Sequence, residues 1–550
     1  MVHSIFGFQL TSRGDPLANP KSVRAWMANV PRNDPVSAVE AINSLLATAP
    51  ARADGSVPRL HAILELDRIA APLFELLRQQ YRLASISDDV RQRILRGCDA
   101  LAAGFSQAYA EYAKQIEATG QPARARELWH GVYARLFYYG NVLTRLGLFR
   151  YEQWIPGRWR ALHQSYLAAR ARSLALEPYT LNPDSRPGEQ STPEQEYVQI
   201  LLLHRLNTGN LTTPQIDWAA EWLREWAPPL RVITAKEGPE QAVGGYWLDV
   251  GLGEGLRDRR PQRAEGELLC LDMEPLRAQL KALIGRLGAQ GNPAATRTGP
   301  GDAEDLLGLA KRLDRLWLPQ APMRARRGER RPANHVVTVA AGWMEIMLAL
   351  QSRHARSSGA PPGYHYDDYG RLRNNKEIRQ RVGAPRRLER DAWQIFDSSD
   401  SGFRIRSLAR QAARQWPGAL LALQVEDAQG WQLGVVRRLK RVGADVTELG
   451  VEVISRNVSL VLPKEIDNRD SGYTVDGIDV EVKGKSFQAL YLPPQAQTRV
   501  RTPASLIVPP AEFTLGRRLS LTIEGQSHPI LLASPLERTR EWVWAPLRSG

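Results

Sequence analysis

Five arginines gather in one eight-residue stretch of the chain, Arg324-Ala-Arg326-Arg327-Gly-Glu-Arg330-Arg331. So many guanidinium groups cannot share a buried core, because each buried charge would need its own partner. The planar forks of arginines spaced four residues apart suit phosphate oxygens and the Hoogsteen edge of guanine. Because the apolar run 336–339 follows at once, the cluster predicts an anion-binding linker that leads into a β-strand.

A second polar motif, Asp397-Ser-Ser399-Asp-Ser-Gly402, lies further along the chain within a stretch that has the composition of a strand and a turn. An Arg-x-x-x-Arg linker followed by Asp-x-Ser-x-x-Gly resembles the PilZ domain, the bacterial receptor module for cyclic di-GMP. The resemblance covers residues 322–456, since the later segments 434–437 and 450–453 also match the family's strands. It implies that the two motifs together clamp the stacked guanines and the phosphates of the messenger.

Two pairs of arginines satisfy the linker spacing, Arg326 with Arg330 and Arg327 with Arg331. We favour the second pair, because family members commonly carry one more arginine just before the first motif arginine. By resemblance, the linker arginines contact guanine and phosphate, while Asp397 and Ser399 bind the second guanine's edge and a phosphate. Gly402 would allow the close turn. The expected ligand-binding set is Arg326, Arg327, Arg330, Arg331, Asp397, Ser399 and Gly402.

One departure from the family pattern is the 65 residues that separate Arg331 from Asp397. A single strand and turn need far fewer, so we expect an insertion over about residues 342–390, with residues 352–385 as a polar loop. In an alternative register, Arg386 and Arg390 form the linker pair and the barrel begins at Ala392. That register leaves few residues for a strand before Asp397, and we rank it lower.

The composition is typical of a multidomain globular protein, with 43% apolar and 24% charged residues in a chain of 550. The formal charge of +14 favours an anionic partner. No apolar run is long enough to span a membrane, and the first residues lack the pattern of a signal peptide. Two cysteines give neither a disulfide framework nor a metal set. We therefore expect a cytoplasmic protein without a membrane span.

The patterning along the chain predicts a multidomain α+β protein. Apolar residues recur at helical spacing through residues 1–226, which predicts an all-α N-terminal domain. Residues 227–321 mix short strands with two helices and read as a small α+β domain. Residues 322–460 form the PilZ-like antiparallel β-barrel with its insertion, and the short apolar runs of 461–550 predict a further β domain.

Motifs of an enzyme are not found in the sequence. The nine histidines lack metal-ligand spacing, and we find no Gly-x-Ser-x-Gly, P-loop or Cys-x-x-Cys. The Gly-Gly-Asp-Glu-Phe and Glu-Ala-Leu motifs of cyclic di-GMP synthases and phosphodiesterases are also missing. We expect a non-enzymatic effector that senses cyclic di-GMP, needs no cofactor or metal, and signals to a protein partner through its helical domain. The alternatives are a ligand-free scaffold with a PilZ-like barrel and, with less support, a nucleic-acid-binding protein, which would normally interleave aromatic residues with its basic ones.

Overall fold

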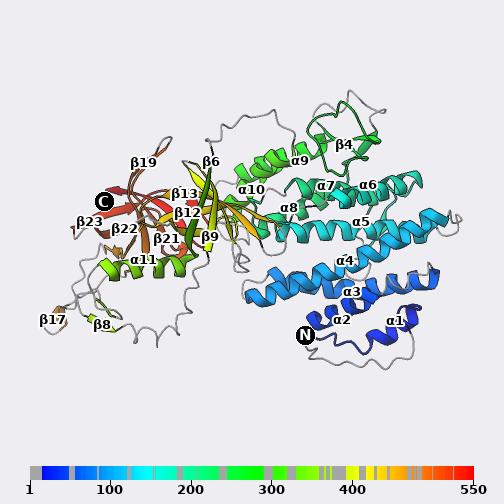
Figure 1. Ribbon diagram of the computed structural model, residues 1–550, viewed down its shortest axis with the longest axis horizontal. Helices are drawn as coiled ribbons and strands as arrows, with labels where there is room; N and C mark the ends of the chain where they lie inside the picture. Colours follow the sequence, from blue (N-terminus) through cyan, green and yellow to red (C-terminus); the bar gives the residue numbers. More distant parts are fainter. Residues whose placement is uncertain are drawn as a thin grey trace. The chain divides into compact units, whose positions relative to one another are not determined.

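The computed structural model describes most of the chain and divides it into two compact units, Met1–Met323 and Arg324–Gly550 (Figure 1). The described residues are 15–48, 56–82, 86–119, 126–152, 154, 156–181, 190–206, 209–234, 245–289, 302–318, 330–357, 364–366, 372–374, 392–399, 401–407, 416–425, 430–442, 446–466, 474–475, 478–479, 486–497, 500–523 and 526–549. The predicted boundary between residues 321 and 322 lies beside this division. The finer boundaries, after residues 226 and 460, stay predictions.

The first unit begins with the helices that the periodicity predicts. They are α1 (Pro20–Met27), α2 (Pro35–Thr48), α3 (Val57–Arg82), α4 (Asp88–Thr119), α5 (Arg126–Phe149), α6 (Pro156–Ala171), α7 (Pro193–Arg205) and α8 (Thr213–Trp226). Local signals fix their starts. At α7, Thr192 Oγ1 accepts from the Gln195 backbone N–H at 3.1 Å, and the Gln195 side chain accepts from the Thr192 N–H at 3.1 Å. This capping box satisfies donors that a helix start leaves unpaired.

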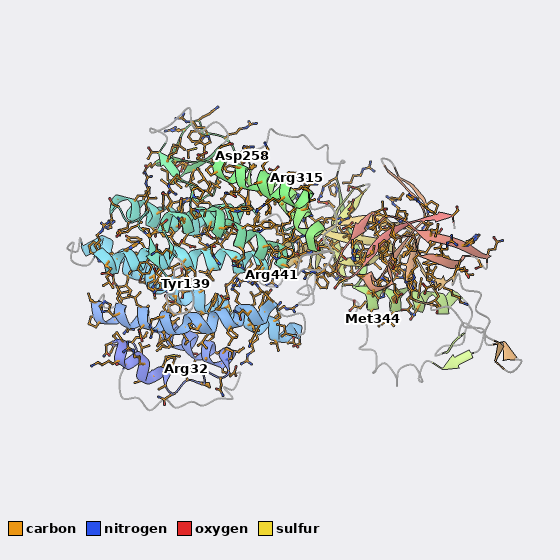
Figure 2. The ribbon with its side chains drawn as sticks, turned by 180° about the vertical axis from the view of Figure 1, so that it is seen from behind. Arg32, Tyr139, Asp258, Arg315, Met344 and Arg441 are labelled. Carbon is orange, nitrogen blue, oxygen red and sulfur yellow. The ribbon has the colours of Figure 1, made fainter. Side chains whose placement is uncertain are left out.

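A buried polar network joins three of these helices at the centre of the unit. The Asp67 carboxylate on α3 accepts from the hydroxyls of Tyr109 on α4 and Tyr139 on α5, at 2.6 and 2.5 Å (Tyr139 is labelled in Figure 2). Arg135 Nη1 donates to the same carboxylate at 3.1 Å. Because an unpaired buried carboxylate is costly, this network favours a single packing of α3, α4 and α5.

The remaining part of the first unit is a small α+β segment. Its three-stranded sheet has the order β3 (Val232–Thr234), β5 (Leu268–Leu271), β4 (Tyr246–Asp249), and the helices α9 (Glu274–Ala289) and α10 (Asp302–Trp317) follow; β1 (Tyr179–Thr180) and β2 (Gln190–Ser191) pair separately. One apolar core cluster contains residues from Leu17 to Leu318. The indole N–H of Trp317 donates to Leu202 O at 2.9 Å. The segment therefore packs as part of the helical core.

The second unit contains a closed antiparallel barrel, as the sequence predicts (Figure 1). Its strands are β6 (Arg331–Ala341), β9 (Ala392–Ser399), β10 (Gly402–Ser407), β11 (Leu420–Val425), β12 (Gln432–Arg441) and β13 (Thr447–Ser455), and the order around the barrel is β10-β13-β12-β11-β6-β9. Alternate residues such as Leu421, Leu423 and Ile405 are buried, as expected of strands that enclose a core.

Between β6 and β9 the chain forms α11 (Trp343–Ser357) and a short hairpin of β7 (Tyr364–Tyr366) and β8 (Leu372–Asn374). The prediction of a loop over 352–385 is therefore wrong where α11 extends to Ser357 and where β7 and β8 pair. The charged C-terminal end of α11 obscures the helical periodicity of this segment in the sequence. Ile346 and Leu350, on the inner face of the helix, are buried. Met344 on the outer face is 62% exposed and is labelled in Figure 2.

The C-terminal residues form further antiparallel strands, which confirms the predicted β region. These strands are β14 (Ser459–Val461), β15 (Lys464–Glu465), β18 (Ala489–Leu492), β21 (Ser505–Val508), β22 (Arg518–Ile523), β23 (Gln526–Leu532), β24 (Glu537–Arg538) and β25 (Val543–Ser549), with a 3-10 turn η4 (Pro510–Glu512) and the small hairpins β16 (Thr474–Val475) with β17 (Ile478–Asp479) and β19 (Gln495–Gln497) with β20 (Val500–Thr502). None of the described helices of the chain combines the length and apolar character needed to span a bilayer.

Candidate functional site

Arg330 and Arg331, the last residues of the arginine cluster, lie at the same end of the barrel as the polar turn. Strand β6 begins at Arg331, and its first residues pair with the last residues of β9, so that Arg331 lies opposite Ser398 and Pro332 opposite Asp397. Arg326 and Arg327 lie outside the described residues. The register nevertheless places the end of the linker beside the Asp397–Gly402 turn, although 65 residues separate the two in sequence.

Asp397 lies between two guanidinium groups that come from different parts of the barrel. Arg330 Nη1 lies 2.9 Å from one carboxylate oxygen, and Arg404 Nε on β10 lies 2.9 Å from the other. The Asp397 side chain is 14% exposed, while those of Arg330 and Arg404 are 52% and 46% exposed. Each guanidinium carries five N–H donors, more than one carboxylate contact uses, and the exposed edges can reach a bound anion.

The turn beyond Asp397 is tightly constrained by the neighbouring strand. Ser399 Oγ donates to Gly402 O at 3.3 Å across the β9–β10 hairpin, where these two residues are partners. A Cβ at Gly402 would lie 2.2 Å from Val451 O on β13. A side chain at position 402 therefore cannot fit unless β13 moves, which is why this position of the motif needs glycine.

Arg404 is a member of this site that the sequence analysis did not assign. Its signal is the alternation of Gly402-Phe-Arg404-Ile-Arg406, in which Ile405 is buried and the two arginines lie on the outer face. Arg406 stacks over the ring of Phe396 at 4.1 Å and also binds Glu448. The outer face of β10 therefore carries two guanidinium groups, one bound to Asp397 and the other to Glu448.

The alternative linker pair, Arg386 and Arg390, lies outside the described residues. The choice between the two linker pairs therefore stays a prediction.

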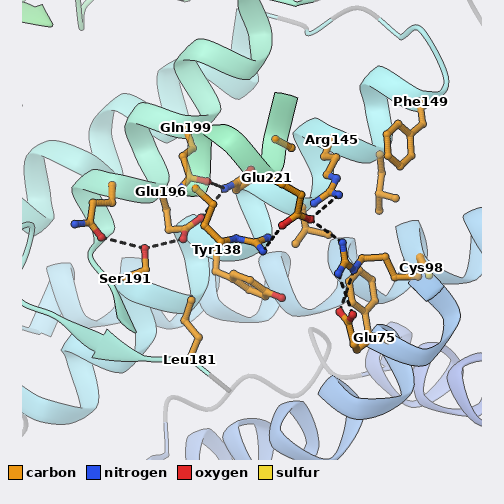
Figure 3. Close-up of a pocket in the computed structure, with 18 of the residues that line it drawn as sticks. Glu75, Cys98, Tyr138, Arg145, Phe149, Leu181, Ser191, Glu196, Gln199 and Glu221 are labelled. Carbon is orange, nitrogen blue, oxygen red and sulfur yellow. Dashed lines mark hydrogen bonds and ion pairs between the residues drawn. The ribbon is translucent and has the colours of Figure 1, made fainter. Parts of the chain in front are cut away.

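The first unit contains a cavity of about 460 Å³ among α3, α4, α5, α7 and α8. Figure 3 shows Phe149 and Cys98 toward one end and Ser191, Glu196 and Gln199 toward the other, with Glu221 between them. It combines an apolar floor with paired polar groups, as ligand pockets often do.

The charged groups of this cavity already bind one another. Glu221 lies 2.9 Å from Arg78, 3.2 Å from Arg145 and 2.9 Å from Arg224. Burial alone would raise the pKa of Glu221, but these arginines bring that pKa down to about 2. Burial lowers the pKa of Arg145, which also binds Asp217. Because the charges compensate within the wall, the cavity makes a weaker anion site than the open arginines of the barrel.

In the described part of the chain, no three or more His, Cys, Asp or Glu side chains form a group that could hold a metal ion. Cys98 and Cys270 are both buried, and burial raises the pKa of each thiol, to about 12 and about 11. Both cysteines therefore stay protonated and unreactive near neutral pH. Neither residue provides the thiolate that covalent catalysis requires.

Two family models match the chain. Residues 21–237 match the N-terminal domain of the cyclic-di-GMP receptor FimW, and residues 371–459 match the middle PilZ domain of the same receptor. Together the two matches cover more than half of the chain. The second match contains Asp397, Ser399, Gly402 and Arg404, and it begins after Arg331. No curated protein matches the sequence.

Proposed function

Because the chain is a PilZ-domain protein, we propose that it is a cytoplasmic receptor that binds cyclic di-GMP at the barrel end where Arg330, Asp397 and Arg404 meet. The observation that carries this proposal is the carboxylate held between two half-exposed guanidiniums at the end of a PilZ barrel. This arrangement offers donors to phosphates and to the Hoogsteen edge of guanine, and an acceptor to the N–H groups of guanine.

Ligand binding on this site is an exchange of partners. The guanidinium of Arg330 would leave Asp397 for a phosphate or a guanine, and Asp397 would accept from guanine N–H groups instead. Ser399 would donate to a phosphate oxygen, while Arg326, Arg327 and Arg331 would complete the clamp from the linker. Since the ligand carries two negative charges and the linker is strongly basic, binding lowers the repulsion among the arginines.

The receptor acts by binding and passes its signal to a protein partner through the helical domain. Ligand would fix the linker against the turn of the barrel and bias the helical domain toward one state. This works as a switch only if the two states bind the ligand with different affinity. The match of residues 21–237 to the N-terminal domain of a cyclic-di-GMP receptor supports a signalling role for the helices.

Isothermal calorimetry of the full chain with cyclic di-GMP tests the proposal. We expect binding by the wild type and its loss in Arg327→Ala/Arg331→Ala, which should keep the wild-type circular dichroism spectrum. Arg386→Ala/Arg390→Ala is the matched control, because it removes the same charge from the alternative linker. Loss of binding in the control alone would move the site to that linker.

The competing functions give different results in the same experiments. A ligand-free scaffold would release no heat at any concentration of cyclic di-GMP. Its function would then depend on the protein partner that it binds. A nucleic-acid-binding protein would bind duplex or single strands with an affinity that falls steeply with salt. Either result without messenger binding would overturn the receptor proposal.

A further inference from the structure

The C-terminal strands close into a ring of their own. The sheet order is β14-β18-β21-β25-β23-β22-β15, and its two edges, β14 and β15, belong to one short stretch, Ser459–Glu465. Pro463 interrupts this stretch because proline has no N–H for the ladder. Lys464 has a strand partner on each side, Ser486 and Ser520. The sheet therefore has no free edge at this stretch and forms a second barrel.

The second barrel has the strand order of the first. Numbered along the chain, the first barrel's strands β6, β9, β10, β11, β12 and β13 neighbour one another in the order 1-2-3-6-5-4 and back to 1. The stretch 459–465 followed by β18, β21, β22, β23 and β25 gives the same order. All these pairs are antiparallel. A chain of consecutive hairpins would not pair strand 3 with strand 6 or strand 1 with strand 4. The two barrels therefore share the two pairings that are least expected from the order of the strands in sequence.

We propose that the C-terminal region is a second PilZ-type barrel, a repeat of the receptor barrel, whose ligand face has become the surface that binds the receptor barrel. In the receptor barrel, the outer face of the second and third strands carries Asp397 and Arg404. In the C-terminal barrel, the corresponding strands are β18 and β21. Their outer residues are Leu490, Leu492 and Ile507, all at most 2% exposed.

These outer residues belong to an apolar cluster that they share with the receptor barrel and its inserted helix. The cluster contains Leu420 of β11 and Leu433 of β12, together with Ile346 and Leu350 of α11. The intervening residues of the same strands, such as Ala489, Leu506 and Val508, belong to a different cluster that fills the C-terminal barrel. Both faces of β18 and β21 are thus buried, one in the barrel core and one at the contact between the barrels.

Polar contacts fix the two barrels in one arrangement. Both terminal guanidinium nitrogens of Arg437 on β12 bind the carboxylate of Glu537 on β24, at 2.5 and 2.7 Å. The indole N–H of Trp542 donates to Gly418 O, just before β11, at 3.0 Å. Apolar contacts are non-directional, whereas the bidentate ion pair and the indole hydrogen bond are directional. These two polar contacts therefore fix the orientation of one barrel against the other.

The C-terminal barrel also lacks the residues that would hold the messenger. The connection from β18 to β21 reads Pro493-Pro-Gln-Ala-Gln-Thr-Arg-Val-Arg-Thr-Pro-Ala504, without Asp-x-Ser-x-x-Gly. An apolar face covered by its neighbour cannot offer a carboxylate and guanidiniums to a nucleotide. Within the described residues, the proposed messenger site therefore lies on the first barrel alone, and the second barrel supports the first.

Hydrogen exchange on the full chain tests the contact without any ligand. Leu492→Ala removes an outer residue of the C-terminal barrel, and we expect exchange of the β11 and β12 amides of the receptor barrel to rise by about tenfold. Leu515→Ala is the control, because Leu515 is 62% exposed in the same barrel, and it should leave those amides unchanged. Where Leu492→Ala does not fold, Trp542→Phe removes the indole N–H bond to Gly418 O together with part of the buried ring, and it has the same readout. Faster exchange confined to residues 459–549 would overturn the proposal.

Calorimetric stoichiometry tests the single site. We expect one class of site in the wild type and no remaining binding in Asp397→Ala. Binding of wild-type affinity that remains in Asp397→Ala would show a second messenger site and overturn the inference. A wild type that binds no cyclic di-GMP would refute the proposed function only, and the exchange experiment would still decide whether the C-terminal barrel covers the receptor barrel.

Discussion

Asp397 is the residue on which the barrel site depends, because its carboxylate holds guanidinium groups from the linker and from β10 in one place. The two contacts have the same length, 2.9 Å, and use different oxygens. Arg330 and Arg404 are therefore held near each other although their charges repel. At the proposed site, a ligand with two phosphates would meet donors that are already oriented, which would lower the free-energy cost of binding.

Arg404→Ala should weaken cyclic di-GMP binding by about tenfold, the effect of losing one charge-assisted hydrogen bond of about 1.5 kcal/mol. The fold should persist, because the Arg404 side chain is 46% exposed. Calorimetry measures the loss. Arg540→Ala, which removes one exposed arginine from the C-terminal barrel, is the control and should bind normally. Equal weakening in both variants would mean that only net charge matters.

Gly402→Ala should destabilise the barrel itself. The added Cβ would lie 2.2 Å from Val451 O, so β13 must shift, at a cost of about 2 kcal/mol or more. We expect the melting temperature of the second unit to fall by about 4–8 °C. Gly450→Ala on β13 is the control, since its Cβ would approach Arg438 Cβ no closer than 3.4 Å. A Gly402→Ala variant as stable as the control would contradict the packing argument.

The sequence was informative about these residues where spacing alone defines the motif. Asp397, Ser399 and Gly402 were found because the motif is contiguous, and the structure places them on one hairpin. Arg404 was missed because the sequence motif ends at Gly402, although the register of the Ser399–Gly402 hairpin places Arg404 opposite Asp397. The roles of all these residues in binding stay predictions.

At the scale of elements, helix α7 shows how a partly buried histidine ring makes stability depend on pH. His204 contacts the Trp159 ring edge-to-face at 4.8 Å between centroids. Burial, with a smaller effect of the Arg205 charge, lowers the pKa of His204 to about 4. The neutral ring is therefore the form that the folded helices accept.

Acid should destabilise the first unit before most carboxylates titrate. The unfolded chain binds a proton at His204 near pH 6.5 and the folded chain only near pH 4, so the free energy of unfolding falls as the pH drops between these values. From pH 7 to pH 5 the loss is about 2 kcal/mol. Urea unfolding at several pH values measures it, and His204→Phe should flatten the dependence. Burial also lowers the pKa of His163, so a smaller pH dependence of stability should remain in the His204→Phe variant.

The matched control for this prediction is His528→Phe, which removes an exposed histidine of β23 in the second unit. It should leave the pH dependence of the first unit unchanged. A wild-type first unit equally stable at pH 7 and pH 5 would contradict the burial argument, because a ring that titrates normally costs the fold nothing.

Elements with strong local signals were predicted well. The capping box of α7 and the apolar stripes of α3, α4 and α5 define these helices without help from the rest of the chain. The sequence could not predict the order of the strands, because both barrels close through pairs of strands that are far apart in sequence, such as β6 with β11. A short apolar run predicts a strand but does not identify its pairing partner.

At the scale of the whole molecule, the chain combines a net charge of +14 with two compact units. The charge is compatible with several anionic partners, so it cannot by itself select one. The division is more useful. Because the proposed messenger site belongs to the unit Arg324–Gly550, a ligand that binds there would stabilise that unit directly and the helical unit only through coupling between them.

Scanning calorimetry of the full chain should therefore resolve this difference. A ligand at a hundred times its Kd adds about 2.7 kcal/mol to the unit that binds it, which raises the melting temperature of a unit of this size by about 5–10 °C. We expect cyclic di-GMP to shift the transition of the second unit and the acid-sensitive transition of the first unit to stay in place. In Asp397→Ala neither transition should move. A parallel shift of both transitions in the wild type would show instead that the units unfold together, and the helical domain would then respond to the messenger through the fold itself.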